Sequence, residues 1–120
     1  MIENERESRH RRVVAAGHRM LTAARTAPKG KGVDILECAL IDGEDIRRLS
    51  DEMKALFAET GRGVYERDSE NILKADCIVV IATHDMPLGL NCAHCGFATC
   101  EAKPAAVPCS INSVDVGIAI

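Results

Sequence analysis

Four cysteines near the carboxyl end of the chain constrain what it can fold into more than any other feature. They are spaced C-x2-C-x4-C-x8-C, at Cys92, Cys95, Cys100 and Cys109. Thiolates that converge from such a segment can ligate the corners of a four-iron cluster, because the x2 step lets two sulfurs of one tight turn reach adjacent corners. The spacing therefore predicts a [4Fe–4S] site in an irregular segment, where Gly89 and Gly96 allow close backbone approach.

Structural zinc is the main alternative to a cluster. Zinc sites usually use two close cysteine pairs, and only Cys92 and Cys95 have that spacing here. His94 lies inside the motif and fits either a zinc ligand or an exposed loop position. The two remaining cysteines, Cys38 and Cys77, lie in apolar stretches and are expected to be core residues rather than ligands.

Composition restricts the classes of function. The 120 residues include two Phe, one Tyr and no Trp, which argues against the aromatic base stacking of single-stranded nucleic-acid binders. A net charge of −3 gives no reason to expect nucleic-acid binding. The amino-terminal residues are charged where a signal peptide would be apolar, and the longest apolar run, Cys77 to Ala82, is too short to span a membrane. A cytoplasmic protein with reduced thiols is therefore expected.

Hydrophobic periodicity predicts an α+β or α/β fold, in which helices pack on a small sheet. The expected elements are a helix over 4–26, a strand over 34–41, a helix that begins at a cap at Asp42 and is closed by Gly61 or Gly63, a short helix capped near Asp68, a strand over 76–82 and a last helix capped by Asn112 or Ser113. Both faces of the first strand are apolar, which predicts a position in the interior of the sheet.

We expect one domain, with an α/β scaffold over 1–82 and a cysteine-rich, cluster-binding segment over 83–111. The last residues include Ile118 and Ile120, with no cap and no polar tail, which indicates an element that is cut short at the carboxyl end. Exposed apolar ends favour association. Together with the apolar stripe of the first helix, they predict a homodimer.

The sequence does not name an enzymatic activity. His84 and Asp85 follow the second predicted strand and fit either an acid–base pair beside the cysteines or polar positions of an exposed loop. No nucleophile–base pair or carboxylate pair elsewhere identifies a substrate.

The segment Gly89–Cys100 contains the core C-x2-C-G-x3-C and resembles a family of uncharacterised prokaryotic proteins described as containing a ferredoxin domain. The further segments that support the resemblance are Ala24–Asp34, Arg67–Asn71 and Asp115–Ile120. The resemblance implies a [4Fe–4S] cluster on the four cysteines and a ferredoxin-like electron-transfer or redox function. It also implies a redox partner protein or a small-molecule electron donor or acceptor.

A second resemblance concerns the loop after the first predicted helix. The run Ala27-Pro28-Lys29-Gly30-Lys31 is similar to the opening of flavin nitroreductases, where such a loop approaches the flavin phosphate. This implies that Arg25, Lys29 and Lys31 bind the phosphate of FMN, although Val33-Asp34-Ile35 stands where that family has Asn and Trp. The alternatives to an electron-transfer protein are thus a flavin-dependent, nitroreductase-like reductase coupled to the cluster and a zinc-stabilised interaction module. For Arg25, Lys29 and Lys31, the alternative to phosphate binding is a basic loop on the protein surface.

Overall fold

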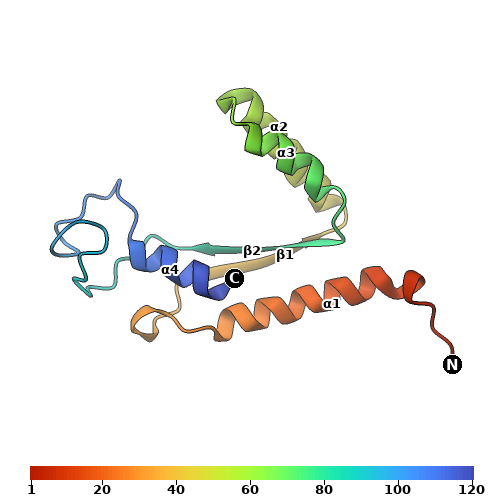
Figure 1. Cartoon of the computed structure of the whole chain (residues 1–120), viewed down its shortest axis with the longest axis horizontal. Helices are drawn as coiled ribbons and strands as arrows, with labels where there is room; N and C mark the ends of the chain where they lie inside the picture. Colours follow the sequence, from red (N-terminus) through yellow and green to blue (C-terminus); the bar gives the residue numbers. More distant parts are fainter. The chain divides into compact units, whose positions relative to one another are not determined.

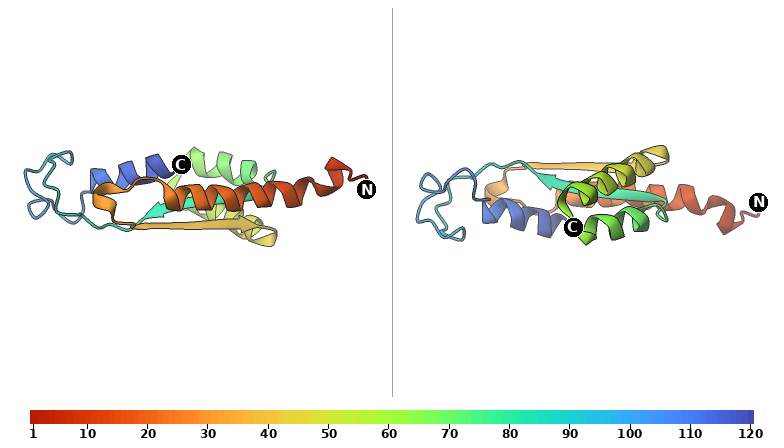
Figure 2. Two further views of the ribbon diagram at one scale, coloured as in Figure 1. Left: turned by 90° about the horizontal axis from the view of Figure 1, so that it is seen from below. Right: turned by 90° about the horizontal axis from the view of Figure 1, so that it is seen from above.

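A computed structural model describes all 120 residues and contains α-helices, one 3₁₀ turn and a two-stranded sheet (Figure 1). The elements are α1 (Glu5–Thr26), η1 (Gly30–Gly32), β1 (Leu36–Asp42), α2 (Glu44–Thr60), α3 (Gly63–Ile72), β2 (Cys77–Thr83) and α4 (Ser110–Ala119). The arrows of β1 and β2 run in opposite directions (Figure 2), and the His84 N–H donates to the Ile35 carbonyl at 3.0 Å. The predicted α+β class is confirmed. None of the helices combines the length and apolarity needed to cross a bilayer.

The sheet has two strands only, so the prediction that the first strand lies in the interior of a sheet is wrong. Each strand has a partner along one edge. Burial along β1 is mixed as well, since Leu36 is buried while Glu37 and Ala39 are exposed. Apolar residues on both faces of a strand report what packs above and below it. They do not report how many strands flank it, which depends on pairing with distant parts of the chain.

The chain forms two compact units. The first consists of Met1–Met20 and Leu40–Val80, and the second of Leu21–Ala39 and Ile81–Ile120. The cysteine-rich segment predicted over 83–111 lies entirely in the second unit. The prediction of a single domain stays a prediction.

In the first unit, α2 and α3 pack against each other as a helical pair (Figure 1). The turn between them depends on Gly61, which has a φ of 69° and donates its N–H to the Phe57 carbonyl at 2.8 Å. This left-handed cap is the role predicted for that glycine. Across the pair, the buried Ser50 hydroxyl donates to the Ser69 carbonyl at 2.8 Å.

The predicted helix starts are wrong in three places. The structure begins α2 after Gly43, α3 after Arg62 and α4 after Cys109, none with a side-chain cap. Capping requires a side-chain oxygen to reach a nearby backbone N–H. Asp68 is inside α3 and pairs with Arg67 at 2.8 Å. In α4, the Asn112 side chain bonds to the Met86 backbone instead of capping the helix.

The second unit has a small core in which Ala24, Leu36 and Ala119 are buried. Ile81 and Val116 pack around it, and so does Cys38, in the position expected of a core cysteine. This core joins the end of α1, both strands and α4. It supports the two ends of the irregular segment that carries the four clustered cysteines.

Candidate metal centre

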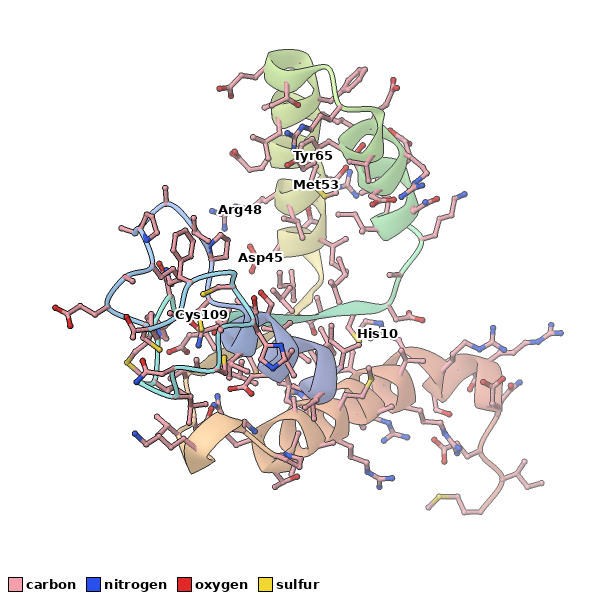
Figure 3. All side chains as sticks on the ribbon, turned by 60° about the vertical axis from the view of Figure 1, so that its left-hand side comes forward. His10, Asp45, Arg48, Met53, Tyr65 and Cys109 are labelled. Atoms are coloured by element: carbon pink, nitrogen blue, oxygen red, sulfur yellow. The ribbon has the colours of Figure 1, made fainter.

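The structure brings all four predicted ligands to one cavity in the second unit. Its thiols belong to Cys92, Cys95, Cys100 and Cys109. Neither Cys38 nor Cys77 lines it. Figure 3 shows sulfur atoms in the irregular segment around Cys109, which precedes the first turn of α4. The four cysteines named from their spacing therefore share one cavity wall, and their role as metal ligands stays a prediction.

The remaining wall of this cavity is mainly apolar. Its apolar side chains are Pro87, Leu88, Leu90, Ala93, Phe97 and Ile111. Lys103 is the one ionisable residue in the wall besides the cysteines. Its ammonium group donates to the carbonyls of Pro104, at 3.2 Å, and Val107, which keeps the charge at the edge of the loop. Nothing in the local sequence distinguishes Lys103 from other surface lysines, so its place in this wall could not be predicted.

Four cysteine thiols are the donor set of an iron–sulfur cluster, and all four line this cavity. As placed, no three Cys, His, Asp or Glu side chains of the chain are arranged to hold a metal ion. Metal–thiolate bonds of about 2.3 Å would hold the sulfurs of a four-iron cluster roughly 6–7 Å apart. Cluster binding therefore requires the thiols to move within a segment that has no helix or strand to resist this. Cys92 is already exposed.

The backbone around the first two cysteines turns repeatedly through left-handed conformations. Positive φ angles occur at Gly89 (73°), Asn91 (48°), Ala93 (61°) and Gly96 (92°). The glycines adopt such angles readily, as predicted, whereas a left-handed alanine costs about 1–2 kcal/mol. The Gly96 N–H donates to the Ala93 carbonyl at 3.0 Å and closes the C-x2-C turn. Strain of this kind is typical of functional segments.

Two buried polar residues of α4 hold the loops that flank the cavity. Asn112 accepts the Met86 N–H at 2.9 Å and donates to the Met86 carbonyl at 3.0 Å. Asp115 accepts the Gly30 N–H at 2.9 Å. Both side chains are 2% exposed. The sequence predicted Asn112 only as a possible helix cap. The signal for its anchoring role is a polar pair at i and i+3, Asn112 and Asp115, within an apolar helix.

Comparison with known proteins gives one informative relative. A protein of Archaeoglobus fulgidus, described as uncharacterized, is 35% identical over 130 residues, which cover the whole of this chain and 70% of the relative. The chain belongs to the family of that archaeal protein. No family model and no solved structure matches it. Membership of this family is therefore shown, while the ferredoxin-domain resemblance stays a prediction.

Two of the cations that the flavin resemblance points to have partners within the scaffold. Arg25 lies 2.8 Å from the Asp34 carboxylate and 2.9 Å from the Leu36 carbonyl. The hydrogen bond from Arg25, helped by the Leu36 N–H, holds the pKa of Asp34 below its ordinary value. The Lys29 ammonium contacts three carbonyls at the end of α1, each at 2.7 Å. A phosphate would compete with these contacts, and flavin binding stays a prediction.

The third cation reaches the cysteine segment. Lys31 is exposed, has a φ of 56°, and donates from Nζ to the Leu88 carbonyl at 3.1 Å. Because Leu88 lines the cysteine cavity, this hydrogen bond ties the loop of η1 to the cavity wall. The hydrogen bond from the Gly30 N–H to Asp115 ties the same loop to α4.

A second, more open cavity of about 260 Å³ shares Cys109 with the first. His84 and Asp85 line it. The partner of His84 in the structure is Glu37 of β1, whose Oε1 lies 3.0 Å from His84 Nε2, and both side chains are largely exposed. His84 and Asp85 thus share a cavity wall with Cys109, while the ion-pair partner of His84 is Glu37 rather than Asp85.

Proposed function

We propose that this chain binds a [4Fe–4S] cluster through its four clustered cysteines and acts as an electron-transfer or redox protein. The supporting observation is the cavity that all four line, together with the exclusion of Cys38 and Cys77 from it. Cysteines that serve only in packing belong in an apolar core. Four of the six cysteines here lie instead in one exposed, irregular segment. A bound cluster would supply a one-electron redox centre.

Three of the four proposed ligands have a local setting that suits a thiolate ligand. Cys92 and Cys95 share the strained turn described above, so their sulfurs can reach neighbouring irons. Cys109 occupies the cap position of α4, where the positive end of the helix dipole favours a thiolate. Lys103 offsets part of the negative charge of four thiolates. The apolar wall disfavours extra negative charge, which corresponds to a low reduction potential.

Exposure indicates where electrons would enter. Cys92 is the exposed ligand, while the other three are half-buried. A redox partner protein or a small-molecule electron donor would therefore approach on the Cys92 side.

We also propose a homodimer, because Val114 and Ile118 of α4 are about half exposed. Light scattering tests this, and a monomer at all concentrations would exclude it.

Metal analysis of anaerobically purified protein decides the proposal. The expected result is a brown protein with about four iron and four sulfide per chain and a paramagnetic signal after dithionite reduction. Serine substitution of each of the four cysteines should lower iron content, whereas Cys38→Ala and Cys77→Ala are matched controls that should retain it. Stoichiometric zinc in a colourless protein would favour the interaction module, and releasable flavin the reductase. Reconstituted protein without iron and sulfide would refute the proposal.

A further inference from the structure

A reciprocal pair of hydrogen bonds links Asn91 to Cys100 within the cysteine segment. The Asn91 backbone N–H donates to Cys100 Sγ, with the nitrogen and sulfur 3.4 Å apart. In return, the Cys100 N–H donates to Asn91 Oδ1 at 2.9 Å. One residue thus orients both the side chain and the backbone of a predicted ligand.

The backbone conformation explains why asparagine suits this position. Asn91 has a φ of 48°, in the left-handed region that side chains other than those of Asn and Asp rarely adopt. That conformation aims its N–H at the Cys100 sulfur. Glycine would permit the conformation but lacks the acceptor. Alanine would lack the acceptor and oppose the conformation as well.

The hydrogen bond to sulfur has a chemical consequence. The sulfur ligands of an iron–sulfur centre carry more negative charge in the reduced form than in the oxidised form. An N–H donor therefore stabilises the reduced form more, which raises the reduction potential of the centre. We infer that Asn91 is a positioning residue that holds Cys100 for cluster ligation and raises the reduction potential of the centre. This inference rests on the proposed function.

The matched substitutions separate the two roles of Asn91. Asn91→Ala removes the acceptor and disfavours the left-handed turn. Asn91→Gly removes the acceptor alone, and Asn91→Asp keeps both the acceptor and the conformation. Asn71→Ala, the same change at an exposed position of α3 in the first unit, serves as the control.

Hydrogen exchange of the Cys100 amide measures the protection given by its hydrogen bond to Asn91, and it can be followed in the cluster-free chain. Asn91→Ala should accelerate this exchange by about tenfold, as expected for the loss of one hydrogen bond. Asn91→Asp should restore the protection, and Asn71→Ala should not change it. Unchanged exchange in Asn91→Ala would overturn the inference.

In the cluster-loaded protein, Asn91→Ala should release iron to a chelator about tenfold faster, the lower end of the effect of losing a ligand-supporting residue. Its midpoint potential should move to a more negative value, with Asn91→Gly between it and the wild type. A wild type that binds a cluster, beside an Asn91→Ala variant with the same potential and release rate, would overturn this inference alone. A wild type that takes up no cluster would overturn the proposed function as well.

Discussion

Replacement of Asn112 by alanine probes how the start of the cysteine segment is held to the helix that follows Cys109. Asn112 is 2% exposed, and its amide makes two hydrogen bonds to the Met86 backbone, at 2.9 and 3.0 Å. Each such bond contributes about 1 kcal/mol. Because Met86 is exposed and water can replace part of the loss, we expect Asn112→Ala to destabilise the second unit by about 1–2 kcal/mol.

The assay is urea unfolding of the cluster-free chain, combined with hydrogen exchange of the Met86 amide. Asn112→Asp keeps the acceptor for the Met86 N–H and loses the donor, so its loss should be intermediate. Ser113→Ala is the control, because Ser113 is the exposed neighbour on the same helix. In the cluster-loaded protein, Asn112→Ala should also weaken iron retention, by about tenfold or more. Normal protection of the Met86 amide in Asn112→Ala would refute the reasoning.

Two further predictions concern the scaffold. The Gly17→Ala variant should be less stable than the Gly117→Ala variant, although alanine favours either helix by up to about 1 kcal/mol. A Cβ at Gly17 would lie 2.6 Å from Leu40 Cδ1, whereas a Cβ at Gly117 would meet nothing within 4 Å. Equal unfolding midpoints of the two variants in urea would contradict this. The lowered pKa of Asp34 implies that its bond with Arg25 is fully present above the ordinary Asp pKa of about 3.9 and is lost as pH falls through the lowered value. The stability gap between the wild type and Asp34→Asn should therefore be widest near neutral pH and narrow in acid, and a gap independent of pH would show that the carboxylate is not stabilising.

The elements that the sequence predicts correctly are those governed by neighbours along the chain. The long helix α1 follows from its apolar spacing, and the end of α2 follows from a glycine that can adopt a positive φ at Gly61. The choice of the four cysteines also rests on local spacing, and their role as ligands stays a prediction. Spacing within a short loop limits which sulfurs can meet, so Cys92 and Cys95 are placed in one turn before any fold is known.

Tertiary structure decided the features that depend on distant residues. A two-stranded sheet, rather than an interior strand, reflects long-range pairing that apolar composition does not encode. Asn112 and Asp115 could be assigned to loop anchoring only once Met86 and Gly30 were placed beside α4. The Asn91 link to Cys100 likewise needs the φ angle of a single residue. A polar side chain takes its role from the buried backbone group it satisfies, and that group is chosen by the fold rather than by the local sequence.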